Sequence, residues 1–362
     1  MSVRAFKYAS PFLAFALAYI SFTSTGWLTF LPVIWSYTII PLFELIVKPD
    51  ETNLEATEEE MAKKDRVYDY FLYLVPVFLY ASLIVFLFSF QQPDLHLTDY
   101  IGRIMTMGLL CGIFGINVGH ELGHRANKFE QTLAKALLLT SQYMHFFIEH
   151  NRGHHKRVAT PDDPSSARMN EPVFSFYYRT IIHSYISAWQ IAIKDVRKKG
   201  AKIISLQNEM VQYTIIQVAF IAIIFFAFGG LITLCYLLSA GSGIALLETV
   251  NYIEHYGLQR KEIEPGKYER AMPQHSWNSS HVIGRLMLFE LSRHSDHHYM
   301  ASRKYQVLRH HDGSPQMPTG YPGMMILAHI PPLFFYVMNK RIKKYNVTPE
   351  ILNKSLQFFP AN

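Results

Sequence analysis

The stretch from Leu97 to His124 reads LTDYIGRIMTMGLLCGIFGINVGHELGH and joins an apolar run directly to two histidines. As an α-helix, residues 97–118 would be roughly 33 Å long, which matches the ~30 Å of hydrocarbon in a bilayer. His120 and His124 are four residues apart, so a continuing helix would carry both imidazoles on one face. This stretch therefore predicts a membrane-spanning helix that ends in a pair of potential metal ligands.

Two other apolar runs are too long to be single spans. Residues 11–47 contain one charged side chain, Glu44, and as one helix would be almost twice as long as the hydrocarbon is thick. We expect this run to fold back at residues 23–26 (TSTG), and the run from 211 to 252 to break at Gly229-Gly230. The predicted fold is an all-α integral membrane protein with six transmembrane helices, at approximately 9–25, 27–47, 68–90, 97–118, 211–228 and 231–252.

The distribution of basic residues predicts the orientation in the membrane. The loops on one side contain no Lys or Arg; they lie around Ser24, Pro93 and Gly229. By the positive-inside rule, both termini and both large polar segments, 119–208 and 253–362, face the cytoplasm. We therefore predict a single domain over residues 1–362, in which a cytoplasmic helical cap carries the histidines.

Three further segments carry expectations about the membrane surface. Residues 174–195 and 324–338 are apolar but interrupted by polar side chains, which is typical of amphipathic helices that lie on or near the surface. Arg103 falls inside the fourth predicted span, and we expect its side chain to extend outward to the interface.

Composition narrows the possible classes of protein. Charged residues make up 17% of the 362 residues, against about 25% in typical soluble domains, which excludes a disordered chain. The net charge of +6 is a mild excess that gives no support for a nucleic-acid partner. Cys111 and Cys235 form no C-x-x-C pair, which excludes a disulfide framework and a cysteine-ligated iron centre. No glycine fingerprint of a flavin or dinucleotide site is present.

Nine of the seventeen histidines fall into four clusters at or beyond the cytoplasmic ends of predicted spans. The clusters are His120–His124 (HELGH), Glu149–His155 (EHNRGHH), Asn251–Gly257 (NYIEHYG) and His294–His298 (HSDHH). Nine imidazoles are too many for one metal ion, whereas two ions with four or five ligands each would use them all. Imidazole binds iron, copper, nickel and zinc, so the ligand type leaves the metal open.

Longer strings around these histidines resemble the membrane-bound alkane 1-monooxygenase family, within the integral-membrane non-haem di-iron hydroxylases and desaturases. The boxes H-x3-H, H-x3-HH and H-x2-HH are typical of the larger group. The strings that resemble the narrower family are HELGHR (120–125), EHNRGHHKRVATPDDPSSAR (149–168), NYIEHYGL (251–258), HSWNSSH (275–281) and LSRHSDHH (291–298). Arg125 stands where the family more often has Lys, and Ser292 where Gln is usual; neither is a presumed ligand.

The resemblance implies an enzyme that uses O₂ to hydroxylate medium- or long-chain n-alkanes from the bilayer to 1-alkanols. It implies that two iron ions are bound by His120, His124, His150, His154, His155, His255, His294, His297 and His298. It also implies that rubredoxin, fed by an NAD(P)H-dependent reductase, supplies the electrons, and that the protein lies in the bacterial cytoplasmic (inner) membrane. The chain itself is then expected to bind no flavin, haem or nucleotide.

Several polar residues beside these histidines are candidates for orienting a ligand ring. The carboxylates are Glu121, Glu149, Glu254 and Asp296, with Asp162 and Asp163 as weaker candidates. The histidines are His145, His275 and His281, for which an ordinary structural role is the alternative interpretation.

Two further hypotheses concern substrate and partner. Trp35 lies near the middle of the second predicted span, away from the interface where Trp usually lies, and is a candidate for closing the end of an alkyl pocket; ordinary helix packing is the alternative. A basic cytoplasmic surface suits an acidic electron carrier. Its residues are Arg125, Lys128, Arg152, Lys156, Arg157, Arg168 and Arg293.

Other activities are compatible with parts of the pattern. A fatty-acyl desaturase or an aromatic-methyl hydroxylase would belong to the same superfamily. An intramembrane zinc protease would need only His120, Glu121, His124 and one more carboxylate. A metal transporter would place its ligands near the middle of the bilayer, whereas these clusters lie at one surface.

Overall fold

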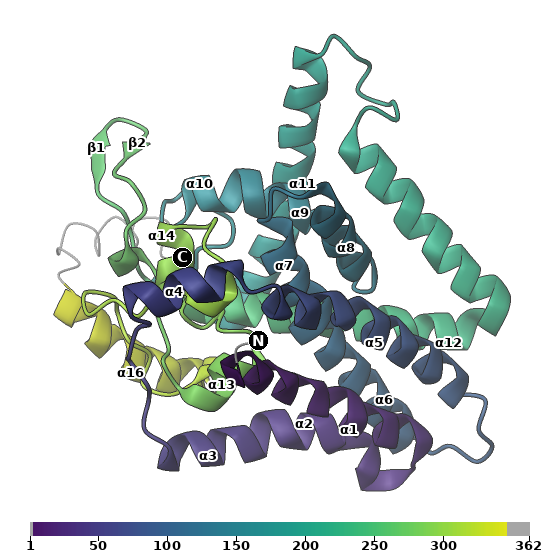
Figure 1. Cartoon of the computed structure of the whole chain (residues 1–362). Coiled ribbons are helices and arrows are strands. Elements are labelled where there is room, and N and C mark those ends of the chain that lie inside the picture. Colours follow the sequence, from purple (N-terminus) through teal and green to yellow (C-terminus); the bar gives the residue numbers. More distant parts are fainter. Residues whose placement is uncertain (1–2, 346–362) are drawn as a thin grey trace.

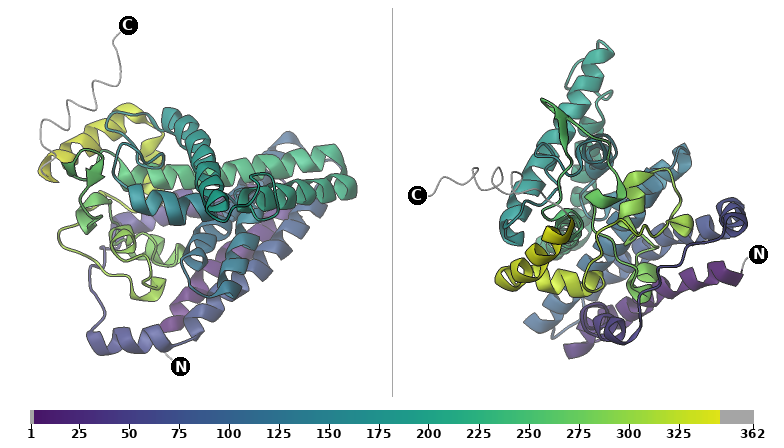
Figure 2. Two further views of the ribbon diagram at one scale, coloured as in Figure 1. Left: turned by 90° about the horizontal axis from the view of Figure 1, so that it is seen from above. Right: turned by 90° about the vertical axis from the view of Figure 1, so that its left-hand side faces the viewer.

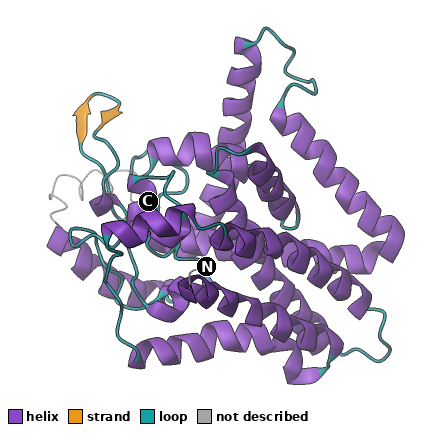
Figure 3. Ribbon diagram, in the orientation of Figure 1, coloured by secondary structure: helices purple, strands orange, loops and turns teal. Residues whose placement is uncertain are grey.

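The computed structural model describes residues 3–345, which form a helical protein with one small antiparallel hairpin of strands (Figures 1 and 3). Within the described residues, five helical stretches are long and apolar enough to cross a membrane: Val3–Thr23, Gly26–Ile46, Val67–Ser89, Leu97–Gly123 and Glu209–His255. The prediction of a mostly helical membrane protein is confirmed at this level. Of the predicted segment 253–362, residues 346–362 lie outside the described residues.

The first two stretches form an N-terminal helical hairpin along one side of the bundle (Figure 1). Its outward arm is η1 (Val3–Phe12) and α1 (Leu13–Thr23), and its return arm is η2 (Gly26–Phe30), α2 (Leu31–Ile34), η3 (Trp35–Ile39) and α3 (Ile40–Ile46). The chain folds back at residues 23–26, as predicted. Gly26 lies in this turn with a φ of 66°. Its N–H donates a hydrogen bond to Asp99 Oδ1 at 2.6 Å, which connects the turn to the fourth membrane-length stretch.

The third and fourth stretches bring the first histidines into place. They are α5 (Val67–Ser89), then α6 (Leu97–Leu110), the π-helix η4 (Cys111–Ile116) and α7 (Asn117–Gly123), followed by α8 (Lys128–Leu139). Before them, α4 (Ala56–Lys64) packs on the polar end of the molecule. Arg103 reaches outward to the loop end of the spans, as expected, but its side chain is fully buried there. Its guanidinium donates to the carbonyls of Ser24, in a loop, and Ser89, the last residue of α5, at 2.7 Å, so these carbonyls replace solvent.

The last apolar stretch, α12 (Glu209–His255), consists of two helices that meet at a kink. Gly229 has φ of 81° and ψ of 174°, and the two halves meet there at an acute turn at the right of Figure 1. The break falls where Gly229-Gly230 predicted it. The second half lies against α6 and η4 and carries His255 to the histidine end.

The polar segments fold over the other end of the bundle (Figures 1 and 2). The first consists of α9 (Phe146–Glu149), the π-helix η5 (His150–His154), α10 (His155–Arg157) and α11 (Val173–Lys198). The second consists of β1 (Glu262–Glu264), β2 (Lys267–Tyr268), η6 (Pro273–His275), α13 (Val282–Met287), α14 (His294–Tyr299), η7 (Tyr305–Val307), α15 (Tyr321–Ala328), α16 (Pro331–Ile342) and η8 (Lys343–Tyr345).

The two predicted amphipathic segments both form helices. Residues 174–195 lie within α11, whereas residues 324–338 are divided between α15 and α16. The division falls before Pro331-Pro332, because proline starts a helix readily but cannot continue one.

Small residues allow α12 to approach α6 and η4 closely. A Cβ on Gly243 would lie 2.8 Å from Cys111 Cβ, 3.0 Å from the Gly108 carbonyl oxygen and 3.1 Å from the Gly112 nitrogen. Two of these three neighbours are backbone atoms, which cannot move without moving a helix. Gly241, two residues earlier, has nothing within 4 Å of the same position.

We expect Gly243→Ala to lower the free energy of unfolding by about 1–3 kcal/mol, because the added methyl group forces the helices apart. Thermal melting in detergent measures the change. Gly241→Ala adds the same methyl group in open space and is the matched control. Equal melting temperatures for the two variants would contradict the close packing.

Candidate metal centre

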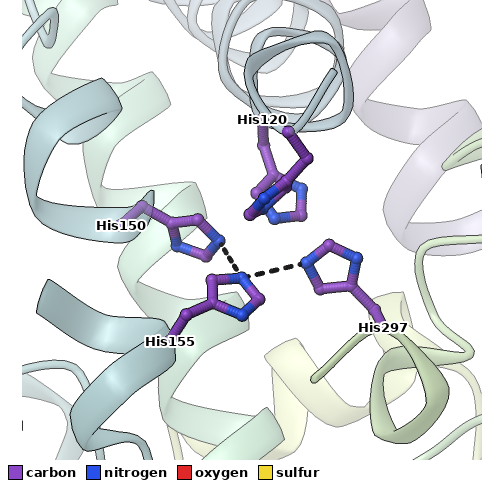
Figure 4. A group of neighbouring side chains, drawn as sticks. His120, His150, His155 and His297 are labelled. Atoms are coloured by element: carbon purple, nitrogen blue, oxygen red, sulfur yellow. Dashed lines mark hydrogen bonds between the residues drawn. The ribbon is translucent and has the colours of Figure 1, made fainter. Parts of the chain in front are cut away.

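The nine histidines that the sequence predicts as ligands converge in two adjacent groups. Among the described residues, one group is His120, His124, His150, His155 and His297, and the other is His154, His255, His294 and His298. Within each group, one ring nitrogen from every histidine lies within 4.8 Å of those of the others. Figure 4 shows four members of the larger group pointing toward a common centre.

Each sequence cluster contributes through a different helix end. The first pair comes from α7 and from the residue that follows it, and His255 is the last residue of α12. The second cluster (Glu149–His155) and the fourth (His294–His298) are each divided between the two groups. Rings of the two groups are in contact, since His155 stacks on His298 with centroids 4.5 Å apart.

A π-helical turn explains how the second cluster is divided. In an α-helix His150 would share a face with His154, four residues on. In η5 the N–H of His155 bonds to the carbonyl of His150, five residues back, which is the π-helical pattern. This turn brings Nε2 of His150 and Nε2 of His155 to 2.9 Å, while His154 points into the other group.

The nitrogen–nitrogen distances suit ligands of a shared ion. In the larger group, Nε2 of His297 lies 3.2 Å from Nε2 of His155. In the smaller group, the Nε2 pairs His154–His298 and His294–His255 are 3.3 and 3.2 Å apart. Ligands about 2.1 Å from one ion, at angles between octahedral and tetrahedral, are about 3.0–3.4 Å apart. The Nε2 atoms therefore face the positions where ions would lie.

Several ring nitrogens in the groups have no hydrogen-bond partner among the described residues, although they are buried. They are both nitrogens of His120, Nε2 of His124, and Nδ1 of His294, His297 and His298. Burying a polar atom without a partner is costly, and coordination removes that cost for the nitrogens that face the ions. The donor set, nine imidazoles, fits iron.

Asp163 is the carboxylate that orients a ring in the manner the prediction describes. Its Oδ2 lies 2.9 Å from Nδ1 of His154, which leaves Nε2 of that ring for the centre. Burial opposes the charge on Asp163, but His154 and the hydroxyl of Ser166 outweigh it and hold the pKa of the carboxyl below its usual value. The sequence ranked Asp163 below four other carboxylates, because it is not adjacent to a histidine.

Glu254 lies beside Nε2 of His294, whereas Asp163 lies beside Nδ1 of His154. Oε2 of Glu254 is 3.2 Å from Nε2 of His294, the nitrogen that faces His255, and its Oε1 accepts a hydrogen bond of 2.7 Å from the Tyr321 hydroxyl. The Glu254 carboxylate therefore lies at the centre where the Nε2 atoms converge, and does not orient a ring through its Nδ1 atom. Tyr321 was not predicted, and nothing in its sequence neighbourhood marks it.

The segment that contains His275 contacts the His255 ring on its Nδ1 side. The His255 ring hydrogen-bonds the backbone of His275, and its Nδ1 lies 3.5 Å from the hydroxyl of Ser276. The His275 side chain itself turns to Glu269, 3.2 Å away. The predicted orienting role thus belongs to the backbone at this position.

The remaining candidate carboxylates bind other partners. Glu149 accepts from Arg157 at 2.7 Å, and burial raises its pKa above the usual value. Glu121 accepts from Arg125 at 2.6 Å and from the Tyr305 N–H at 3.2 Å. Asp296 accepts from Arg303 at 2.6 Å and contacts His311 at 2.7 Å. These contacts stabilise the helical cap. None of them joins a carboxylate to a histidine of either group.

His145 and His281 also lie away from the two groups. His145 packs against Tyr143 and Tyr185, and burial lowers its pKa to about 3. Nδ1 of His281 lies 3.0 Å from the Ser279 hydroxyl. The structural interpretation of both residues fits these contacts.

The prediction of a continuous basic surface is wrong. Arg125 and Arg293 are buried, Arg293 against the carbonyls of Thr52 and Leu308. Arg152 pairs with Asp195, and Arg157 with Glu149. Lys128 and Lys156 are the exposed lysines of the set.

Two apolar cavities lie within the helical bundle. The first is lined by His120, His150 and His294 together with Asn251 and Glu254. The second is lined by Trp35, Tyr37 and Met325. Because both are lined by Ile113, Leu246, Val250, Leu288 and Tyr321, we treat them as the inner and outer parts of one candidate cavity. Trp35 lines the outer part, which no histidine lines.

Known proteins resemble the chain along most of its length. Residues 98–327 match the family model described as Fatty acid desaturase. Alkane 1-monooxygenase 1 of Alcanivorax borkumensis is 37% identical over 325 residues, covering 89% of this chain and 80% of the relative. Alkane 1-monooxygenase of Acinetobacter baylyi is 39% identical, covering 84% of this chain and 75% of the relative. The xylene/toluene monooxygenase hydroxylase component XylM of Pseudomonas putida is 28% identical, covering 72% and 69%.

We expect Asp163→Asn to weaken metal binding by about 10- to 100-fold, because the amide no longer holds the His154 ring as a charged acceptor. Metal retained per chain after dialysis against a chelator measures the loss. The neighbouring Asp162 is exposed, so Asp162→Asn is the matched control. Equal retention by both variants would show that Asp163 does not support a ligand.

Proposed function

Because the chain belongs to the alkane 1-monooxygenase family, within the larger fatty acid desaturase group, we propose that it uses O₂ to hydroxylate a terminal carbon of medium- or long-chain n-alkanes. The product is a 1-alkanol. The observation that carries the proposal is the joining of two buried histidine groups to one apolar cavity.

The nine histidines would hold two iron ions, one in each group. Bound iron, supplied with O₂ and two electrons, provides an oxidant strong enough for an unactivated C–H bond, which acid–base or nucleophilic groups cannot attack. The chain's own residues set the surroundings. Asp163 and the backbone of His275 fix two ligand rings, and Glu254 with Tyr321 forms a polar wall beside the smaller group.

The cavity would bind the alkyl chain and exclude water. Leu246, Val250 and Leu288 line both of its parts, so a chain that lies between Trp35 and the histidines contacts apolar side chains along its length. A dry site also protects a reactive oxidant from side reactions. An alkane has no polar group to orient it, so the shape of the cavity must place the terminal carbon at the histidine end.

The membrane arrangement forms part of the proposal. We take the two halves of α12, on either side of Gly229, as two spans, which gives six in total. The histidine end then faces the cytoplasm of a bacterial inner membrane as a helical cap, with both termini on that side. The domain covers residues 1–362, with catalytic segments 119–208 and 253–362.

Electrons would come from rubredoxin, reduced by an NAD(P)H-dependent reductase. Both cysteines of the chain are buried and far apart in sequence, so neither can serve as part of a cysteine-ligated centre. Because Arg125 and Arg293 are buried and Arg152 and Arg157 are paired, the predicted set of basic residues does not form a docking surface for the carrier.

A zinc protease is disfavoured by the position of Glu121. A general base must reach the metal-bound water, but the Glu121 carboxylate is held by Arg125 and by the Tyr305 N–H. A fatty-acyl desaturase or an aromatic-methyl hydroxylase of the same superfamily is separated from the proposed activity by its products.

The proposal is tested by metal analysis and turnover of the purified protein. We expect about two irons per chain, one per histidine group. With rubredoxin, its reductase and NAD(P)H, octane or hexadecane should yield the 1-alkanol, and chelation should abolish turnover. One zinc per chain, or desaturation of an acyl thioester without alkane hydroxylation, would refute the proposal.

We expect Trp35→Ser to shift turnover from octane toward longer alkanes, because it enlarges the outer part of the candidate cavity. The ratio of 1-hexadecanol to 1-octanol formed from an equimolar mixture measures the shift. Trp27, in the same helical hairpin, is 81% exposed, so Trp27→Ser is the matched control. An unchanged ratio in Trp35→Ser would leave this residue with a packing role alone.

A further inference from the structure

An exposed apolar stripe runs along α11, a 26-residue helix that is not among the five candidate membrane spans. Its members recur at helical spacing, so they share one face. They are Phe174, Tyr178, Ile182, Tyr185 and Ile186, which are 58%, 75%, 38%, 43% and 44% exposed. A row of five large apolar side chains in water would be unfavourable, so this face needs a covering.

The helix has three distinct faces. Phe176, Thr180 and Ser187 are buried against the protein, where Thr180 donates to Glu248 and Ser187 contacts Arg157. His183, Gln190 and Lys194 form an exposed polar face. The apolar stripe lies between these two faces. A helix with one face on protein, one in water and one apolar has the pattern of a helix embedded in an interface.

The direction of α11 agrees with this interpretation. In Figures 1 and 2 it runs across the direction of the long helices of the bundle and projects from the body. A helix that crosses the direction of the spans lies roughly in the plane of the membrane. Its stripe is then positioned to enter the outermost layer of acyl chains.

A second apolar face continues the stripe. The Tyr177 hydroxyl lies 3.1 Å from Nε2 of His329, the residue that follows α15, and Phe174 contacts the same ring. Just beyond, Ile330, Leu333 and Tyr336 are 48%, 46% and 62% exposed. We call the exposed apolar residues of α11 and these three residues the collar.

Cations lie at both ends of the collar. At the end of α11 and in the loop that follows, Arg197, Lys198, Lys199 and Lys202 are all exposed. The same loop exposes Ile204 by 85% and Leu206 by 70%. At the other end, Lys340 is exposed and lies 3.5 Å above the Tyr336 ring. Apolar side chains flanked by exposed cations are complementary to a surface of anionic headgroups.

We propose that the collar is a lipid-binding surface, which inserts its apolar residues into one leaflet and binds anionic phospholipid headgroups through Lys198, Lys199 and their neighbours. The collar fixes how deep the histidine groups lie relative to that leaflet. On its buried face, α11 contacts Arg157, beside the second histidine cluster, through Ser187, and Glu248 of α12 through Thr180. This role is independent of the reaction that the histidines support.

The first test places an environment-sensitive fluorophore on introduced cysteines in bilayer nanodiscs. Ile182→Cys reports the apolar stripe, and Gln190→Cys on the polar face is its control; the unmodified chain is the blank, since Cys111 and Cys235 are buried. We expect blue-shifted emission, quenched by nitroxide-labelled phospholipid, at position 182 and water-like emission at position 190. Water-like emission at 182 would overturn the proposal. So would blue-shifted emission without lipid quenching, since that would indicate a second copy of the chain over the stripe.

The second test measures preference for headgroup charge. Each exposed cation near an anionic surface contributes about fivefold to binding. We therefore expect spin-labelled phosphatidylglycerol to associate severalfold more tightly than phosphatidylcholine, and Lys198→Glu/Lys199→Glu to remove most of that preference. Lys261→Glu/Lys267→Glu on the exposed β1–β2 hairpin makes the same charge change elsewhere and should leave it intact. An equal loss in both double variants, or no loss in either, would overturn the assignment of the headgroup site.

Discussion

Nine imidazoles packed against one another in a buried interior leave several ring nitrogens without a hydrogen-bond partner, and cations between the rings would satisfy nitrogens that face them. A neutral imidazole has one donor and one acceptor nitrogen, and the Nε2 atoms of His150 and His155 face each other at 2.9 Å with no oxygen between them. Protonation would place like charges side by side. Metal ions between these nitrogens would complete the architecture at the point where the four histidine-bearing segments meet.

The sequence was sufficient to predict the helical framework and the members of both groups. Apolar runs longer than a bilayer had to turn, and they do so at residues 23–26 and at Gly229. The boxes could be recognised because helical spacing places several rings on one face. These features are local, so a single sequence carries them.

The sequence was insufficient where geometry departs from the α-helix or where partners come from afar. A π-turn pairs His150 with His155, and no residue type in that box marks such a turn. Asp163 supports a ring although it is eight residues beyond the nearest ligand in the chain. The predicted basic surface failed for a related reason. Arg125 pairs with Asp69, and Arg293 donates to the carbonyls of Thr52 and Leu308. These partners come from distant segments, so a count of charges along the chain cannot reveal them.

The two ends of the helical bundle differ in the source of the positive charge that stabilises them. At the histidine end the protein supplies nitrogens and the positive charge must arrive from outside. At the far end Arg103 supplies the positive charge itself, and the carbonyls of Ser24 and Ser89 accept hydrogen bonds from it. That far end is complete as soon as the chain is synthesised. The far end can therefore pack without a bound ion, whereas packing at the histidine end is linked to metal binding.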